Sequence, residues 1–273
     1  MDRKLVAIDL DGTTLNNASV ITDETHQAIQ QLIKKGHIVS IVTGRSYRTS
    51  SHFYKQLKLT SPMVNFNGAW CHHPNEINWD YGYHSSLNRD VALSLLDLKK
   101  YPVIQLIAAE AKDLVFVDRD FDSIKEFTVP VNLENTNTLP FTSEALVDDP
   151  TSVNVFSYSA EHLPFIQEKI IEKNGENVEV RTWGGDTPTL EVVSAGIQKA
   201  VGVERIAQYY DIDRKNIIAF GDEANDYEMI QYAGHGVAMN NGIDDLKKIS
   251  DDVTPLSNDK DGLAHYLMDY FNL

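Results

Sequence analysis

Cysteine is almost absent from this chain of 273 residues, which contains only Cys71. A single cysteine excludes an internal disulfide and is typical of proteins from a reducing compartment, so we expect a cytoplasmic protein. Cys71 is followed by two histidines, His72 and His73. Adjacent side chains on a strand point in opposite directions, however, and we therefore expect a structural cysteine and not a nucleophile.

Cationic side chains and long apolar runs are also scarce. Lysine and arginine total 24 against 40 aspartates and glutamates, and the net charge of −16 repels the phosphates of nucleic acids and anionic membranes. No apolar run approaches the roughly 18 residues of a membrane span, and residues 1–4 lead straight into a predicted strand. We expect neither nucleic acid nor a membrane as a partner. The length allows one large domain or two of ordinary size.

The first stretch whose side chains could carry out chemistry is residues 5–13, Leu-Val-Ala-Ile-Asp-Leu-Asp-Gly-Thr. Residues 5–8 predict a strand buried on both faces, which ends in Asp9 and Asp11. Because strand side chains alternate, we expect both carboxylates to point into the same small volume. Two negative charges at such a short distance repel each other unless a cation or a shared proton relieves them. The pair therefore predicts a metal site or one protonated acid. Taken alone, the motif is also compatible with an acidic turn in solvent.

Polar side chains follow the next two predicted strands as well. Thr43, Gly44 and Arg45 stand between a strand and a helix, where a hydroxyl and free backbone N–H groups make a natural anion site. Alone, this triplet is typical of an ordinary turn. Asn67 follows the third predicted strand. Strands that alternate with helices at this spacing predict a parallel, doubly wound sheet, in which ligands bind beyond the carboxyl ends of the strands.

The alternation of strands and helices breaks after residue 82 and returns after residue 186. The expected elements between them are a helix at 89–99 and strands at 103–108, 114–117 and 153–158. We therefore expect a core domain of residues 1–82 and 187–273, with residues 83–186 inserted as an α+β domain. The turn-rich residues 183–188 are the expected hinge, and a strand at 189–193 is expected to resume the core.

The second part of the core adds further polar groups. Lys199 stands at the start of a predicted helix, which by itself is typical of a solvated lysine. A predicted buried strand at 216–220 runs into Gly221 and Asp222. Asn225 and Asp226 come up to one helical turn later. Asp222 is therefore expected at the same edge of the sheet as Asp9.

Together these motifs resemble the haloacid dehalogenase superfamily of phosphohydrolases. The matching motifs, in order, are Asp9-Leu10-Asp11-Gly12-Thr13, Thr43-Gly44-Arg45, Lys199 and Gly221-Asp222-Glu223-Ala224-Asn225-Asp226. The large insert between the second and third motifs resembles the Cof-type (subclass IIB) sugar phosphatases, as do residues 67–68, 237–241 and 261–262. The insert itself matches only in size and position, and Ala200 stands where the branch often has glycine. The resemblance implies an α/β fold, a doubly wound parallel sheet with an inserted α+β cap domain.

The resemblance also implies catalytic roles for the motif residues. Asp9 is the expected nucleophile, which forms an aspartyl-phosphate, and Asp11 the expected general acid that later activates water. Thr43, the Gly44 N–H and Lys199 are expected to hold the phosphoryl oxygens.

A hard oxygen-ligand cation, Mg²⁺, is the expected cofactor. The expected ligands are the side chains of Asp9 and Asp222 and the backbone carbonyl of Asp11. Asp226 is expected to orient Lys199 or a metal-bound water. The further expected contacts to substrate are Arg45, Asn67 and Asn225.

Other kinds of site are not supported by the residues. A calcium-binding EF-hand loop that began at Asp9 would need glycine and an acid where Thr14 and Val20 stand. The pair Gly234 and Gly236 lacks the third glycine of a dinucleotide-binding loop, since Met239 occupies its place. No Gly-Lys-Ser/Thr loop is present, and the histidines do not have zinc-ligand spacing.

The expected function is Mg²⁺-dependent hydrolysis of a small phosphorylated metabolite, a sugar phosphate or a phosphorylated cofactor. A phosphomutase or phosphotransferase uses the same intermediate and differs in that it releases no free phosphate. A non-catalytic module that binds a phosphorylated metabolite is the third alternative. The retention of Asp9 and Asp11 argues against it, because a binder gains little from two facing carboxylates. The sequence indicates neither an oligomeric state nor the residues that select the substrate.

Overall fold

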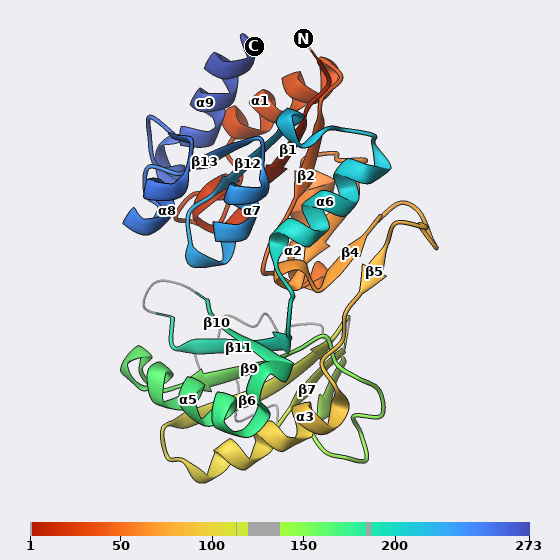
Figure 1. Ribbon diagram of the computed structural model, residues 1–273, viewed down its shortest axis with the longest axis vertical. Coiled ribbons are helices and arrows are strands. Elements are labelled where there is room, and N and C mark those ends of the chain that lie inside the picture. Colours follow the sequence, from red (N-terminus) through yellow and green to blue (C-terminus); the bar gives the residue numbers. More distant parts are fainter. Residues whose placement is uncertain (1, 113, 120–136, 184–186) are drawn as a thin grey trace. The chain divides into compact units, whose positions relative to one another are not determined.

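The computed structural model describes residues 2–112, 114–119, 137–183 and 187–273. It divides into two compact units. The core unit comprises Met1–Ser46, Ser50–Tyr83 and Gln198–Leu273, and the inserted unit comprises Tyr47–Thr49 and His84–Ile197. The chain leaves the core unit within β5 (Tyr83–His84) and returns just before α6 (Lys199–Tyr209) (Figure 1).

A five-stranded sheet forms the centre of the core unit, in the order β14-β13-β12-β1-β2. Its strands are β1 (Leu5–Ile8), β2 (Ile38–Ile41), β12 (Ile217–Gly221), β13 (His235–Ala238) and β14 (Asp252–Val253). Every neighbouring pair is parallel. The strand order reverses direction at β1, with β2 on one side and β12 on the other, so a crevice is expected beyond the ends of β1 and β12. The predicted doubly wound parallel sheet is confirmed.

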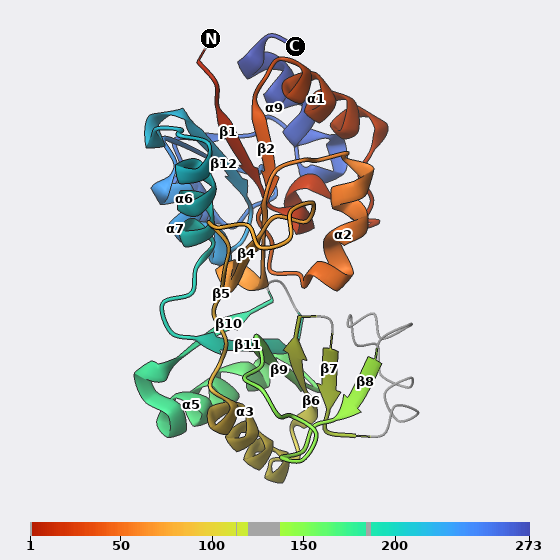
Figure 2. The same ribbon diagram turned by 90° about the vertical axis from the view of Figure 1, so that its right-hand side faces the viewer.

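Helices cover both faces of this sheet, with α1 and α9 on one face and α6 and α7 on the other (Figure 2). The helices of the core unit are α1 (Asp23–Lys34), α2 (Tyr47–Gln56, of which Tyr47–Thr49 belong to the inserted unit), α6 (Lys199–Tyr209), α7 (Tyr227–Tyr232), α8 (Asp244–Ile249) and α9 (Gly262–Phe271). Leu5 and Ala7 of β1 pack with Val203 and Ile206 of α6 in one buried cluster. Burial on both faces explains why β1 is an unbroken apolar run. Among the described residues, no helix is long and apolar enough to cross a membrane.

The third predicted strand belongs to a different sheet from the one expected. A separate three-stranded sheet contains β3 (Met63–Asn65), β4 (Trp70–His72) and β5 (Tyr83–His84). An isolated parallel bridge between Val42 and Val64 joins β3 to the segment that follows β2. Phe66 and Asn67 adopt left-handed conformations, which turn the chain back into the antiparallel β4. Cys71 in β4 is fully buried, and burial raises the pKa of its thiol to about 12, so it remains an unreactive thiol.

The inserted unit contains a six-stranded sheet in the order β10-β11-β9-β6-β7-β8. Its strands are β6 (Ile104–Ala111), β7 (Leu114–Val117), β8 (Asn137–Pro140), β9 (Ser152–Ser157), β10 (Val178–Thr182) and β11 (Thr189–Ser194). The pairings are antiparallel except between β7 and β8. Helices α3 (Arg89–Ser94) and α5 (Leu163–Asn174) pack on one face of this sheet (Figures 1 and 2). The inserted unit thus has the α+β character and the separate core that the sequence predicts.

One strand that we expect in the core unit belongs to the inserted unit. The strand expected to resume the core at 189–193 is β11, which pairs with β10 and β9 inside the inserted sheet, so that assignment is wrong. Its apolar residues Leu190 and Val192 pack into the core of the insert. The expected hinge at 183–188 therefore falls between two paired strands, and residues 184–186 of it lie outside the described residues. The core unit begins again at Gln198.

Candidate active site

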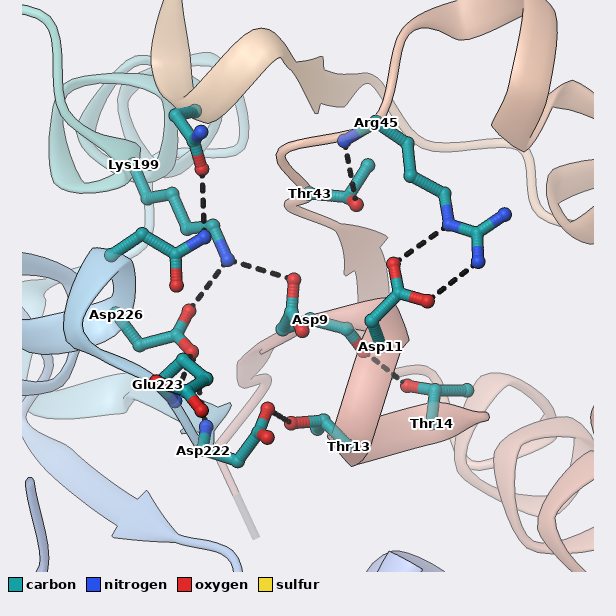
Figure 3. A network of polar contacts seen from close by, with 12 residues as sticks. Asp9, Asp11, Thr13, Thr14, Thr43, Arg45, Lys199, Asp222, Glu223 and Asp226 are labelled. Carbon is teal, nitrogen blue, oxygen red and sulfur yellow. Dashed lines mark hydrogen bonds and ion pairs between the residues drawn. The ribbon is translucent and has the colours of Figure 1, made fainter. Parts of the chain in front are cut away.

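Three acidic side chains and one lysine meet beyond the carboxyl ends of β1 and β12 (Figure 3). Asp9 directly follows β1, Asp222 directly follows β12, and Asp226 ends the short turn after it. Lys199 is the first residue of α6. Carboxylate oxygens of the three aspartates lie within 4.8 Å of one another. All four side chains are buried, so their charges interact with little screening by water.

Lys199 lies inside the protein, between two of these carboxylates. Its Nζ is 2.7 Å from Oδ1 of Asp9 and 2.6 Å from Oδ1 of Asp226, and the side chain is 0% exposed. Burial lowers the pKa of Lys199, but attraction to Asp226 and Asp9 outweighs it, so the pKa ends above its ordinary value. Lys199 is therefore a fixed positive charge and not a solvated lysine at a helix start.

Asp226 uses both of its oxygens to hold neighbouring groups. Oδ1 accepts from Lys199, and Oδ2 accepts from the backbone N–H groups of Asp222 at 3.0 Å and Glu223 at 3.2 Å. Gly221 makes room for this arrangement, because a Cβ there would lie 2.4 Å from Cγ of Asp226. Asp226 thus orients Lys199 and shapes the turn that carries Asp222.

The turn after Asp9 contacts both cation-ligand candidates through Thr13 and Thr14, which are not among the expected site residues. Thr13 donates its hydroxyl hydrogen to Oδ1 of Asp222 at 3.0 Å. Thr14 donates to the backbone oxygen of Asp9 at 2.5 Å. Gly12 has a φ of +69°, and a Cβ there would lie 2.0 Å from Oδ2 of Asp222. The sequence places Gly12 and Thr13 in the first motif but gives no sign of their contact with Asp222, which lies 209 positions from Thr13.

Asp11 faces a different partner from Asp9. Both of its carboxylate oxygens accept from Arg45, with Nε to Oδ2 at 2.7 Å and Nη2 to Oδ1 at 2.5 Å, and its side chain is 57% exposed (Figure 3). The expected reason for a shared direction, strand alternation, does not apply, because β1 ends at Ile8 and the chain then turns, with the Leu15 N–H bonded to the Leu10 carbonyl. Each of the two carboxylates therefore faces its own cationic side chain, Asp9 facing Lys199 and Asp11 facing Arg45.

Thr43 and Arg45 form the second expected cluster, beyond β2. The Thr43 hydroxyl accepts from the backbone N–H of Arg45 at 3.1 Å, which closes a tight turn beside Asp9 and Asp11 (Figure 3). Burial lowers the pKa of Arg45, but its hydrogen bonds and attraction to Asp11 leave the pKa above its ordinary value. The guanidinium is therefore a permanent positive charge at the edge of the site.

Asn67 and Asn225 form a third contact within the core unit. Nδ2 of Asn225 donates to Oδ1 of Asn67 at 2.9 Å. Gly44 backs this pair, because a Cβ there would lie 3.0 Å from Oδ1 of Asn67. Gly68, with a φ of +106°, lets the same loop approach α6, since a Cβ there would lie 2.2 Å from the Gln198 carbonyl oxygen. Among the described residues, the buried Oδ1 of Asn225 has no hydrogen-bond partner.

The charges of the buried cluster do not balance within the protein. Burial raises the pKa of Asp9 to about 7 against the attraction of Lys199, with Asp226 and Asp11 adding to the rise. Burial, together with Asp9 and Asp226, raises the pKa of Asp222 to about 9. Both shifts mean that three carboxylates have too little positive charge beside them. A divalent cation with a preference for oxygen ligands would supply that charge, and the side chains of Asp9 and Asp222 could hold it.

The ten residues predicted for the site all lie in the core unit. The structure groups them as Asp9, Lys199, Asp222 and Asp226, then Asp11, Thr43 and Arg45, then Gly44, Asn67 and Asn225. The arrangement places a carboxylate nucleophile candidate beside a buried ammonium group and a cation site. These are the groups needed to bring an anionic phosphate against an anionic oxygen.

Comparison with known proteins gives the same picture. The sequence model of the haloacid dehalogenase-like hydrolase family matches residues 6–267. The 5-amino-6-(5-phospho-D-ribitylamino)uracil phosphatase YitU of Bacillus subtilis (strain 168) is 42% identical over 271 residues, 98% of each protein. The B. subtilis phosphatase YcsE, named for the same substrate, is 29% identical over 268 residues, 97% of this chain and 94% of YcsE.

Solved structures share the fold along the whole chain. The crystal structure of TM0651 from Thermotoga maritima superposes with a TM-score of 0.79 at 25% identity. The superposition covers 98% of this chain and 97% of the TM0651 chain. The sugar phosphatase BT4131, of haloacid dehalogenase subclass IIB, superposes with a TM-score of 0.79 at 22% identity, covering 98% and 99%. The chain therefore belongs to the haloacid dehalogenase-like hydrolases, and within them to the Cof-type phosphatases.

Proposed function

We propose that the protein is a Mg²⁺-dependent phosphatase that hydrolyses a small phosphorylated metabolite through an aspartyl-phosphate on Asp9. The observation that carries the proposal is the buried cluster in which Lys199 holds Asp9 and Asp226 while Asp222 lies beside them. A structural ion pair needs one acid for one base. Three buried carboxylates around one lysine are instead arranged to receive further positive charge and an anionic substrate.

Asp9 is the group that attacks phosphorus. Lys199 holds its Oδ1, while Oδ2 accepts no hydrogen bond from any part of the chain that the structure describes. In the first step a bond forms from Asp9 to phosphorus, and the bond from phosphorus to the ester oxygen breaks. In the second step water attacks the phosphorus of the aspartyl-phosphate, which frees Asp9 and releases inorganic phosphate.

Asp11 handles the protons in both steps. Asp11 enters the first step in its protonated form and gives this proton to the departing ester oxygen. As a carboxylate it then takes a proton from the attacking water, which restores the protonated form. Because Arg45 donates to both oxygens of Asp11, one of these two hydrogen bonds opens before that oxygen takes up the proton. Arg45 in this way holds the exposed Asp11 carboxylate beside the buried cluster until a substrate is present.

The remaining groups hold the phosphoryl oxygens and the cation. Lys199, Thr43 and the Gly44 N–H are the proposed donors to the phosphoryl group, with Asn225 as a further contact. Mg²⁺, held by Asp9, Asp222 and the Asp11 carbonyl, would neutralise charge between the phosphate and Asp9.

The substrate that the comparisons favour is 5-amino-6-(5-phospho-D-ribitylamino)uracil, the compound in the name of a relative 42% identical along 98% of this chain. This compound is a phosphate ester of a sugar alcohol, which agrees with the expected class of sugar phosphates. A panel that contains this compound, hexose phosphates and phosphorylated cofactors tests the choice. The highest kcat/KM on another member of the panel would reject it.

Replacement of Asp9 tests the mechanism. Asp9→Asn keeps the shape of the side chain but removes its nucleophilic charge, so we expect release of inorganic phosphate from an aryl phosphate to fall by at least about a thousandfold. Asp269→Asn, on the exposed side of α9, is the matched control and keeps wild-type turnover. Activity of Asp9→Asn near that of the wild type would defeat the assignment. A wild-type protein that isomerises sugar phosphates without releasing phosphate would be a phosphomutase.

A further inference from the structure

The Thr13 hydroxyl is tied to a residue far along the chain. Thr13 is 1% exposed, and its hydroxyl donates at 3.0 Å to Oδ1 of Asp222, which lies 209 positions away. A carboxylate has two equivalent oxygens and rotates readily about its last bond. A fixed donor on one oxygen ends that equivalence, because the donor occupies one oxygen and leaves the other for a different partner.

Gly12 restricts the same carboxylate from its other oxygen. A Cβ on Gly12 would lie 2.0 Å from Oδ2 of Asp222, so the carboxylate rests directly against the glycine backbone. Any larger side chain at position 12 would displace it. Gly12 and Thr13 therefore flank Asp222 from neighbouring positions of one turn, the first by close approach and the second by a hydrogen bond.

The turn that carries Thr13 is itself anchored from outside the site. Nδ2 of Asn241 donates to the Gly12 carbonyl at 2.8 Å, and Nδ2 of Asn258 donates to the Leu15 carbonyl at 2.8 Å. The backbone N–H of Asn258 donates to Oδ1 of Asn241 at 2.8 Å, which fixes the orientation of that amide. The turn from Gly12 to Leu15 is thus held at both ends by side-chain amides, which fixes the position of the Thr13 hydroxyl.

We propose that Thr13 is a positioning residue that orients Asp222 for the divalent cation and so sets cation affinity. The inference rests on the proposed function, in which Asp222 is a cation ligand. Hydrogen-bond partners of metal ligands hold the ligand in the geometry that the ion needs, and their loss typically weakens metal binding by about 10- to 100-fold. No proton transfer or contact with substrate is assigned to Thr13.

Isosteric replacement of Thr13 tests the proposal by direct cation binding. The ion is Mn²⁺, which takes the same oxygen ligands as Mg²⁺ and whose free form is counted by its EPR signal. We expect Thr13→Val, which keeps the shape and loses the donor, to weaken Mn²⁺ binding by about tenfold. Thr13→Ser restores the hydroxyl and is expected to bind within about twofold of the wild type. Thr13→Ala serves as a second donor-free variant if the valine form does not fold.

Thr25 provides a matched control in the same unit. It is buried in α1, and its hydroxyl donates to Oδ1 of Asp261 at 3.2 Å, so Thr25→Val also removes a buried hydroxyl-to-aspartate bond. We expect Thr25→Val to lower thermal stability like Thr13→Val but to leave Mn²⁺ binding unchanged. Equal Mn²⁺ affinity in Thr13→Val and the wild type, or equal weakening in Thr25→Val, overturns the role of Thr13. Failure of the wild-type protein to bind Mn²⁺ overturns the proposed function as well.

Discussion

Lys199 is the residue on which the charge balance of the site depends. It is paired with Asp9 and Asp226 in the interior, where removal of one partner leaves the others as uncompensated buried charges. Its burial next to the nucleophile also means that a phosphate approaching Asp9 meets a positive charge that needs no rearrangement. One side chain thus contributes both to folding and to the proposed chemistry.

Replacement of Lys199 by methionine is expected to abolish phosphatase activity and to lower the free energy of unfolding by about 3–5 kcal/mol at neutral pH without metal. The physical reason is that Asp9 and Asp226 then remain buried without their cation. Urea unfolding in EDTA measures the loss. The double variant Lys199→Met with Asp226→Asn is expected to recover part of it, because one of the two carboxylates is gone. Lys215→Met, at an exposed ion pair, is the control, and an equal loss there would contradict the argument.

The positions of the site residues follow from the sequence, but several of their contacts do not. Asp9 and Asp222 stand at the ends of strongly patterned strands, so periodicity places them at one edge of the sheet. Lys199 by itself is typical of a solvated lysine, and only the resemblance to a known family places it in the site. The pairing of Asp11 with Arg45 depends on two flexible side chains and on the point where β1 ends. Thr13 has no periodic signal, because its partner comes from the other end of the chain.

The turn between β1 and α1 is the element that joins the two halves of the cation site. It begins at Asp9, passes Gly12 and Thr13 against Asp222, and is anchored from outside by Asn241. Since Gly12 has a φ of +69°, this turn needs a residue without Cβ for two independent reasons, its backbone conformation and the approach of Asp222.

A comparison of alanine variants at Gly12 and Gly36 separates the effect of the backbone conformation from that of the contact with Asp222. Both glycines have positive φ, but a Cβ on Gly36 would meet nothing within 4 Å, whereas one on Gly12 would meet Asp222. We expect Gly36→Ala to cost about 1 kcal/mol of stability with unchanged kcat/KM. Gly12→Ala is expected to lower kcat/KM by about a hundredfold or more, because Asp222 is displaced. Equal kcat/KM in the two variants would show that the contact with Asp222 does not matter.

Sequence patterns locate the elements better than they assign them to units. The strand at Thr189–Ser194 is a short and almost entirely buried segment, and such a segment looks the same in a core sheet and in an inserted one. The turn-rich residues before it predict a hinge as readily as a tight turn, because glycine and proline serve tight turns and linkers alike. Strand pairing decides between the two units, and pairing depends on residues distant in sequence, here those of β9 and β10.

At the scale of the whole molecule, the buried acids make stability depend on both pH and cation. Without metal, the pKa of Asp9 is about 7 and that of Asp222 about 9, both above the ordinary value of 3.8 that applies to the unfolded chain. For each group, at a pH between 3.8 and its pKa in the folded protein, the folded state binds more protons than the unfolded state. The contribution of these two groups to stability is therefore present at acid pH and is lost as the pH rises through about 7 and then about 9.

Mg²⁺ is expected to oppose this loss, since it binds the ionised carboxylates of the folded state alone. Thermal unfolding from pH 6 to pH 9 in EDTA should show a Tm that falls with pH, and excess Mg²⁺ should raise Tm more at pH 9 than at pH 6, because protons compete less. In Asp222→Asn one titrating carboxyl and one cation ligand are absent, so both the fall in EDTA and the gain with Mg²⁺ are expected to shrink. A gain from Mg²⁺ that is the same in Asp222→Asn as in the wild type would place the cation elsewhere on this acidic protein.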